Sequence, residues 1–324
     1  METGELRRWL EAADDPAPLV VETSGSTGRP KRVVLPRRAV LASVVATERR
    51  LGGSGRWALK LPPSYVAGLQ VVCRSLVAGH EPFTGEGWPE GVGWFTSLVP
   101  TQLRRLLDDE GEVEALRRAH TVLLGGGPAD PALRTRAAEA GVRVVATYGA
   151  AETAGGCVYD GVPLDGVGVR IAVSGRIEVT GPTLFAGYEG EPGLTAEVLV
   201  DGWFRTADAG RIDDDGRLQV LGRLDDVVVS GGVNVPGPAV AARLRAHPAV
   251  RDAEVVGVPD EEWGHRLVAF VVGPVSEAEA RAWVAAEHPR SWAPRQVVGV
   301  EEIPLLANGK PDRVRLRALA GAAS

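Results

Sequence analysis

The sequence predicts an α/β protein with a large N-terminal part and a smaller α+β C-terminal part. From Ala17 to Gly149, short apolar runs alternate with segments of helical periodicity, which is typical of a sheet that is at least partly parallel. From about Val167 the runs become short strands separated by glycine and aspartate turns, a pattern of antiparallel β structure. The length of 324 residues allows two domains and a large buried core.

The N-terminal part begins with two expected strands. They cover residues 17–22 (APLVVE) and 32–35 (RVVL), and a helix is expected at 37–51. Further strands are expected at 56–61, 94–99, 121–127 and 142–149, alternating with helices at 66–79, 100–109 and 131–141. This alternation is the reason for expecting parallel strands linked by helices.

The C-terminal part is expected to start at a boundary near residues 222–226. Short antiparallel strands precede it at 168–173, 175–181, 202–212 and 216–223. Beyond it, helices are expected at 239–247 and 277–288, and strands at 253–258 and 267–272. These elements amount to an α+β domain of about 100 residues, which is an ordinary size.

Composition excludes several functional classes. A formal net charge of −6 argues against a general attraction to nucleic acid. Cys73 and Cys157 have neither metal-ligand spacing nor the number that a disulfide framework needs, so a reducing, cytoplasmic setting is expected. Apolar runs stay shorter than the roughly 18 residues of a membrane span, and no signal peptide is expected at the start.

The stretch ETSGSTGRPKR (22–32) concentrates hydroxyl groups, glycines and a lysine in one loop. It is not a Walker P-loop, because Pro30 stands where the second glycine of that motif belongs when counting from Gly25. It is not a nucleophile elbow either, because Ser24 stands at the first glycine position. Glycine flexibility, hydroxyl donors and Lys31 suit a polyphosphate, whereas a glycine- and serine-rich surface turn is the alternative.

Six motifs in this order resemble those of the adenylate-forming superfamily of acyl- and aryl-CoA synthetases. They are TSGSTGRPK (23–31), LGGGP (124–128), YGAAET (148–153), GWFRTAD (202–208), LGRLDD with SGG (221–226 and 230–232) and NGK (308–310). The resemblance implies a large adenylate-forming domain of mixed sheets, helices and a small β subdomain at 1–222. It also implies a hinge at 223–226 and a small mobile α+β domain at 227–324.

Within that superfamily, three stretches are similar to the o-succinylbenzoate–CoA ligases of menaquinone synthesis. They are LPPSYVAGLQVVCRSLVAG (61–79), LLGGGPA (123–129) and AETAGGCVYDGVPLDGV (151–167). The resemblance implies an AMP-forming acid–thiol ligase that uses ATP, Mg²⁺ and CoA and passes through an acyl-AMP intermediate. Three alternatives stay open: another aryl acid as substrate, a carrier-protein thiol as acceptor, and a non-catalytic relative that binds AMP or an acyl group. The assembly state is also open, and it includes a homodimer.

The resemblance assigns residues to the ATP site. The phosphate loop would comprise Thr23, Ser24, Gly25, Ser26, Thr27, Gly28 and Lys31. Adenine and ribose would be bound by Gly125, Gly126, Gly127, Tyr148, Gly149, Asp208 and Arg223. Glu152 would coordinate Mg²⁺, and the catalytic residues would be Lys310, Glu152 and Arg223.

The acyl and CoA sites are inferred from motif position. Acyl-pocket candidates are Tyr65, Val66, Gly68, Leu69, Ser97, Gly155 and Gly156, where glycines would open a slot for an aromatic ring and core packing is the alternative. Asp225 would be the hinge residue. The CoA side would be formed by Ser230, Gly231 and Gly232, the two glycines leaving room for the pantetheine arm.

Four departures from the superfamily pattern accompany these matches. Ala151 replaces the usual Thr or Ser, Ala207 replaces a Gly, and Arg32 replaces the Gly after the loop lysine. The segment 235–238 (VPGP) lacks the usual acidic residue. One lost neutral hydrogen bond costs about 1 kcal/mol, so these changes predict a slower or altered enzyme more readily than an inactive one.

Overall fold

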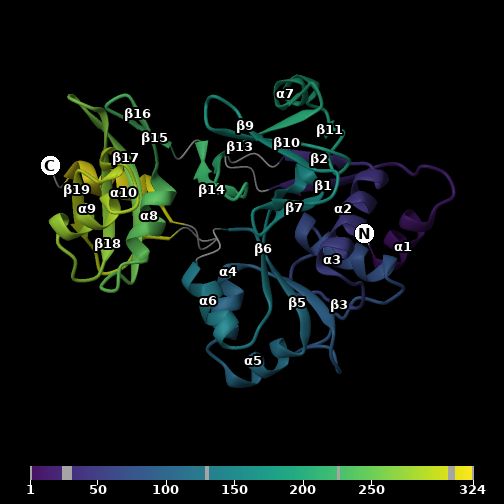
Figure 1. Ribbon diagram of the computed structural model, residues 1–324. Helices are drawn as coiled ribbons and strands as arrows, with labels where there is room; N and C mark the ends of the chain where they lie inside the picture. The colour runs from purple at the N-terminus through teal and green to yellow at the C-terminus, as the bar shows by residue number, and fades with distance from the viewer. Residues whose placement is uncertain (1, 24–30, 128–130, 225–226, 306–310, 323–324) are drawn as a thin grey trace. The chain divides into compact units, whose positions relative to one another are not determined.

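The computed structural model describes residues 2–23, 31–127, 131–224, 227–305 and 311–322 of the chain (Figure 1). Expected site residues outside these ranges are Ser24, Gly25, Ser26, Thr27, Gly28, Asp225 and Lys310. The chain forms two compact units. The first comprises Met1–Ala172, Glu178–Thr206 and Ile212–Leu218, and the second comprises Val173–Ile177, Ala207–Arg211 and Gln219–Ser324.

A six-stranded sheet in the first unit contains the expected parallel strands. Its order is β3 (Trp57–Ala58), β4 (Trp94–Leu98), β5 (Ala119–Leu124), β6 (Val144–Ala150), β7 (Gly155–Tyr159) and β8 (Val162–Pro163). Strands β3 to β6 run parallel, whereas β6, β7 and β8 are antiparallel neighbours. The sheet is therefore mixed, as the alternation of strands and helices predicts.

Helices follow the parallel strands in sequence. They are α3 (Val66–Val77), α4 (Pro100–Leu106), α5 (Glu110–Arg117) and α6 (Pro131–Glu139). The single helix expected at 100–109 is wrong at its end, because the Asp109 carboxylate accepts a 3.0 Å hydrogen bond from the Glu112 amide and starts a new helix there. Leu103, Leu116 and Leu133 of these helices pack in one apolar cluster with Leu98 and Leu124 of the sheet.

A second, three-stranded sheet follows the order β1 (Leu19–Thr23), β2 (Lys31–Leu35) and β11 (Gly187–Tyr188). Helix α2 (Arg37–Leu51) covers the predicted range and ends at Gly52, which has a left-handed φ of 77°. Val33 and Leu35 of β2 are fully buried in a cluster with Val40 and Val44 of α2. Helix α1 (Thr3–Glu11), which the sequence did not predict, adds Leu6 to this cluster.

The predicted short strands after Val167 form a five-stranded sheet. Its path is β12 (Leu199–Val200), β13 (Trp203–Ile212), β10 (Arg176–Thr180) and β9 (Gly168–Ile171), and β14 (Leu218–Arg223) also pairs with β13. The short element η1 (Ala151–Thr153) precedes these strands in sequence, and α7 (Pro192–Val198) lies between β11 and β12.

The second unit contains the expected α+β elements. A hairpin of β15 (Val227–Ser230) and β16 (Val233–Pro236) precedes α8 (Gly237–Arg245). A further sheet pairs β17 (Asp252–Asp260) with β18 (Gly264–Val272) antiparallel and β18 with β19 (Gln296–Gly299) parallel. The unit is completed by α9 (Glu277–Ala285), η3 (Arg290–Trp292) and α10 (Arg313–Ala322).

Both faces of the β17–β18–β19 sheet are covered by helices. Val255 and Leu267 pack in one apolar cluster with Leu244 of α8. Val256 and Phe270 point to the other face, in a cluster with residues of α10. Alternate residues of each strand therefore serve two cores, which explains why β17 and β18 have almost continuous apolar sequences.

Candidate active site

The ends of the parallel strands bring several predicted residues together. Strands β4, β5 and β6 are adjacent and parallel, with Leu98 opposite Leu124 and Leu124 opposite Ala146. Gly125–Gly127 follow β5 directly, Tyr148 and Gly149 lie near the carboxyl end of β6, and Glu152 follows that strand. In open α/β sheets this edge is the usual place for a ligand, so the sequence motifs lie where such a site is expected.

The phosphate loop joins two paired strands. Thr23 ends β1 and lies opposite Lys31, which begins β2, so the described residues on either side of the loop are paired antiparallel. Strand β2 pairs on its other edge with β11, which places Tyr188 opposite Val33. The sequence predicted the loop and Lys31, but it gave no indication of this second neighbour.

Tyr188 contacts both charged residues at this end of the site. Its hydroxyl donates a 2.7 Å hydrogen bond to Oε1 of Glu152, and the Lys31 ammonium lies 5.2 Å from the centre of its ring. Tyr188 and Glu152 are 6% and 9% exposed, so their hydrogen bond is shielded from water. Lys31 and Glu152, which are far apart in the sequence, are thus linked through a buried tyrosine.

A tight turn fixes Glu152. Its carbonyl accepts a 2.9 Å hydrogen bond from the Phe185 amide, and the Thr153 hydroxyl accepts one of 2.9 Å from the Ala150 amide. Ala154 ends the turn in the left-handed region, with a φ of 50°. Ala151 is buried in the apolar cluster of β2 and α2, so the residue that replaces the usual hydroxyl serves here as core packing.

The motif glycines are required by close packing. A Cβ on Gly149 would lie 2.1 Å from the Gly155 carbonyl oxygen, and one on Gly125 would lie 2.6 Å from the Thr147 hydroxyl. Gly126 has a left-handed φ of 76°, which other residues rarely adopt. Side chains at these positions would separate β5, β6 and β7 at the edge that carries the motifs.

The acyl-pocket candidates divide into packed and exposed positions. Tyr65 is 52% exposed at the start of α3, whereas Leu69 is buried in the β2–α2 cluster and Ser97 is buried within β4. A Cβ on Gly68 would lie 2.2 Å from the Pro62 carbonyl oxygen. For Leu69 and Gly68, packing alone therefore accounts for the residue type.

Gly155 and Gly156 lie in β7 beside α3. A Cβ on Gly155 would point to Gln70 of α3, 3.2 Å from its Cγ, and one on Gly156 would lie 3.1 Å from both Thr147 and Tyr159. The side of each glycine on which a Cβ would lie is therefore filled by protein. An aromatic slot at these glycines stays a prediction.

The ribose candidates occupy neighbouring strands. Asp208 lies in β13 and Arg223 ends β14, and an oxygen of Asp208 lies 3.7 Å from Nη1 of Arg223. Two motifs that are separate in the sequence are thus joined within the second unit. The carboxylate can accept hydrogen bonds from hydroxyl groups while the guanidinium balances its charge.

The expected CoA-side residues form the turn between β15 and β16. Ser230 is 6% exposed, and a Cβ on Gly231 would lie 2.6 Å from the ring of Trp263. The Cβ side of Gly231 is therefore filled by this ring, and the expectation that the two glycines leave room for the pantetheine arm stays a prediction. A Cβ on Gly232 would meet no atom within 4 Å, so the open position of the pair is Gly232.

A metal at this site would rely on one carboxylate. Among the residues that the structure describes, no group of three or more His, Cys, Asp or Glu could hold a metal ion. Tyr188 occupies one oxygen of Glu152 and leaves the other available as a single ligand. This arrangement suits Mg²⁺, which commonly binds one or two carboxylates together with substrate phosphates.

Besides Ala151, two further departures from the superfamily pattern have structural roles. Arg32 forms ion pairs with Glu189, next to Tyr188, and with Glu22 at 3.9 Å. A Cβ on Gly222, which has a φ of 129°, would lie 2.9 Å from the ring of Pro238. Arg32 therefore links β2 to the end of β11, and the segment 235–238 packs against the predicted hinge motif.

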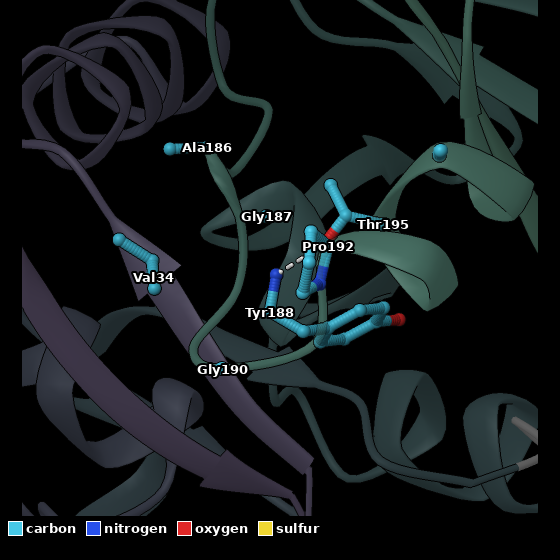
Figure 2. Close-up of a pocket in the computed structure, with 8 residues that line it drawn as sticks. Val34, Ala186, Gly187, Tyr188, Gly190, Pro192 and Thr195 are labelled. Carbon is cyan, nitrogen blue, oxygen red and sulfur yellow. Dashed lines mark hydrogen bonds between the residues drawn. The ribbon is translucent and has the colours of Figure 1, made fainter.

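A cavity of about 420 Å³ lies beside β11 and α7 (Figure 2). It is lined by Val34, Ala186, Gly187, Tyr188, Gly190, Pro192, Thr195 and Ala196. Tyr188, which lines this cavity and bonds Glu152, is the site residue that sequence reasoning missed. Tyr188 lies outside the six motifs, and its contact with Glu152 depends on the pairing of β2 with β11.

Comparison with known proteins decides the family. The sequence profile described as AMP-binding enzyme matches residues 9–189, and that described as AMP-binding enzyme C-terminal domain matches residues 239–310. The chain belongs to the AMP-binding enzyme family. The fold expected from the motifs, with its large and small parts, is that of this family and is confirmed.

Within the described residues, no helix has the length and apolar character needed to cross a membrane.

Several similar proteins are described as 2-succinylbenzoate–CoA ligases, the group that the motifs resemble. A probable 2-succinylbenzoate–CoA ligase of Mycobacterium tuberculosis is 44% identical, with 97% of this chain and 87% of the relative covered. The o-succinylbenzoate CoA synthetase (MenE) from Bacillus subtilis, solved with the acyl-adenylate intermediate OSB-AMP, is 28% identical with a TM-score of 0.80, covering 94% of this chain and 70% of that one. The amide bond synthetase McbA from Marinactinospora thermotolerans is 30% identical with a TM-score of 0.81, covering 93% and 69%. The expectation of an AMP-forming ligase is confirmed at the level of the family.

Proposed function

We propose that this AMP-binding enzyme joins 2-succinylbenzoate to coenzyme A, a reaction of menaquinone synthesis. A carboxylate oxygen of the acid attacks the α-phosphorus of ATP, the bond to the β-bridging oxygen breaks, and pyrophosphate leaves. The sulfur of CoA then bonds to the acyl carbon, the carbon–oxygen bond to AMP breaks, and the thiol proton passes to solvent. The products are the CoA thioester and AMP, and the site of the reaction would be the cytoplasm.

The buried link between Lys31, Tyr188 and Glu152 carries the proposal for the first step. A cation and a carboxylate held on one tyrosine at the end of a glycine- and hydroxyl-rich loop suit a polyphosphate better than an uncharged ligand. Mg²⁺ bound between Glu152 and the phosphates would neutralise charge on the leaving pyrophosphate. The protein's own contribution is then to position the phosphates and to exclude water from Glu152.

Asp208 and Arg223 are our candidates for binding the ribose of the nucleotide. Asp208 would accept hydrogen bonds from the ribose hydroxyls, and Arg223, 3.7 Å from it, would help to orient that carboxylate. The adenine would lie against the Gly125–Gly127 segment and Tyr148. Since the two half-reactions need different groups, we place a hinge at 223–226, between a large domain at 1–222 and a small domain at 227–324.

The proteins similar to this chain favour 2-succinylbenzoate as the acid. The Mycobacterium tuberculosis relative, at 44% identity over 97% of this chain, is described as a probable 2-succinylbenzoate–CoA ligase, and the Bacillus subtilis neighbour binds OSB-AMP. Gln70, Val66 and Gly155 lie together where α3 meets β7, and we place the aromatic ring beside them. Tyr65 and Ser97 are the candidates for the second carboxylate of the acid.

The test is an assay of the purified protein with ATP, Mg²⁺ and a panel of acids. We expect pyrophosphate release with 2-succinylbenzoate, followed by AMP and a CoA thioester when CoA is added. Benzoate and succinate, which carry only the ring or only the aliphatic acid, should be poor substrates. An absence of pyrophosphate with every aryl acid offered would contradict the enzymatic function and favour a protein that only binds AMP or an acyl ligand.

A second candidate keeps the adenylation and changes the acceptor. It is favoured by the similarity in fold to the amide bond synthetase, which has a TM-score of 0.81. In the same assay, pyrophosphate release without a CoA thioester would support this candidate. Offering amines and a carrier-protein thiol would then identify the acceptor.

A further inference from the structure

Tyr188 is placed to act on two functional groups at once. Its hydroxyl donates a 2.7 Å hydrogen bond to Oε1 of Glu152, and the Lys31 ammonium lies 5.2 Å from the centre of its ring. We propose that Tyr188 is a positioning residue that sets the distance and orientation between the metal-binding carboxylate and the phosphate-binding lysine. This inference rests on the proposed function and assigns a residue that none of the sequence motifs contains.

The backbone of Tyr188 is held from several sides. Its amide donates a 2.9 Å hydrogen bond to the Thr195 hydroxyl, which itself donates a 2.9 Å bond to the Glu191 carbonyl (Figure 2). Its ring packs edge-on against Phe185 at 5.1 Å between centres. Since Phe185 also binds the Glu152 carbonyl through its amide, the tyrosine and the glutamate are held by the same segment.

The hydrogen bond to Glu152 defines which carboxylate oxygen remains available. Tyr188 donates to Oε1, so the plane of the carboxylate is fixed and Oε2 is the oxygen that can bind a cation. Groups of this kind, which orient a metal ligand without touching the metal, typically change metal affinity about 10- to 100-fold when removed. The 9% exposure of Glu152 leaves little water to replace the lost donor.

The ring has a separate effect on Lys31. A cation over an aromatic face is attracted to it, and this contact limits the freedom of a long side chain. Lys31 begins β2 directly after the phosphate loop, so its ammonium is held near the loop's end. The hydroxyl and the ring of Tyr188 can therefore be tested by different substitutions.

Tyr188→Phe removes the hydroxyl and keeps the ring. Binding of Mn²⁺ as a substitute for Mg²⁺ is measured by electron paramagnetic resonance in the presence of α,β-methylene ATP, which cannot release pyrophosphate. We expect the Mn²⁺ dissociation constant to rise at least about tenfold, and the Mg²⁺ concentration for half-maximal adenylation to rise in parallel. Affinity for the nucleotide without metal should change little, because the Lys31 contact is kept.

The matched control is Tyr159→Phe. Tyr159 is another buried tyrosine of the first unit, 2% exposed, and its hydroxyl bonds the Thr47 hydroxyl at 2.9 Å. This change removes a buried hydrogen bond away from Glu152, so it should lower stability without changing Mn²⁺ binding. If both variants change Mn²⁺ binding equally, or if Tyr188→Phe leaves it unchanged, the positioning role is wrong.

Tyr188→Leu removes the ring as well and should also weaken binding of the metal-free nucleotide. Unchanged nucleotide binding in this variant, with its fold verified by circular dichroism, would contradict the role of the ring. A failure of the proposed function is distinguishable, because the unmodified protein would then release no pyrophosphate with any aryl acid. The Mn²⁺ measurement does not depend on which acid is the substrate.

Discussion

Lys31 and Arg32 are neighbouring cations with different surroundings. The Lys31 ammonium lies over Tyr188, whereas Arg32, whose side chain is 54% exposed, pairs with Glu189 and Glu22. Successive residues of a strand point to opposite sides, so adjacent charges in β2 serve a buried site and a solvated surface. Sequence reasoning gave Lys31 its role but could not give one to Arg32, whose partners depend on strand pairing.

Substitution of the two residues by alanine should separate these roles. Lys31→Ala should raise the KM for ATP at least about tenfold, since a charge-assisted contact to phosphate is lost. Arg32→Ala should change the free energy of unfolding by less than about 1 kcal/mol, because exposed ion pairs contribute little, and should leave the KM nearly unchanged. ATP kinetics and urea denaturation measure the two effects, and a larger kinetic effect at Arg32 would contradict the assignment.

Both cysteines should be unreactive in the folded protein. Burial raises the pKa of the Cys73 thiol and of the Cys157 thiol to about 12 in each case. Because the thiolate is the reactive form, an aromatic disulfide reagent at pH 8 should label neither residue until the protein is denatured. Rapid labelling of the native protein would contradict the burial of the Cys73 thiol in α3 or of the Cys157 thiol in β7. The same property lets free CoA be measured with that reagent in the presence of the protein.

At the scale of elements, local signals predicted some boundaries and missed others. Helix α2 matches its predicted range because Pro36 precedes it and Gly52 ends it in a left-handed conformation. Helix α1 was missed, although Leu6, Trp9 and Leu10 recur at helical spacing and pack in the cluster of β2 and α2. The position of Tyr188 beside Glu152, 36 residues apart, could not be predicted because it requires the register of β11 on β2.

Two helical glycines provide a test of packing at this scale. A Cβ on Gly68 in α3 would lie 2.2 Å from the Pro62 carbonyl oxygen, whereas one on Gly193 in α7 would meet no atom within 4 Å. Gly68→Ala should therefore destabilise the protein by about 1–3 kcal/mol or more, and Gly193→Ala should be neutral or stabilising by up to about 1 kcal/mol. Urea denaturation measures both changes. Equal effects at the two positions would contradict the close approach at Gly68.

At the scale of the whole molecule, the proposed chemistry is divided between two compact units. Lys31, Tyr188 and Glu152 belong to the first, and Asp208, Arg223 and the Ser230–Gly232 turn belong to the second. The expected large domain at 1–222 includes Asp208, whereas the compact units group Asp208 with Arg223, and the expected domain bounds stay a prediction. The position of the units during each half-reaction follows from no local pattern, and a rotation at 223–226 stays our proposal.

Lys310, which lies outside the described residues, gives a test of that rotation. If this lysine reaches the α-phosphate only during adenylation, Lys310→Ala should lower adenylation by at least about a thousandfold. Thioester formation from supplied acyl-AMP should change much less, since that step would use a different orientation of the small domain. Equal losses in both half-reactions would contradict a rotation that removes Lys310 from the site.

The proposed function requires the protein to make an acyl-adenylate of 2-succinylbenzoate and to pass the acyl group to CoA. The most direct measurement is a single-turnover reaction without CoA, analysed by mass spectrometry, followed by a chase with CoA. We expect a mass corresponding to 2-succinylbenzoyl-AMP before the chase and its replacement by equal amounts of CoA thioester and AMP afterwards. An acyl-adenylate that never forms, or one that forms and persists when CoA is added, would contradict it.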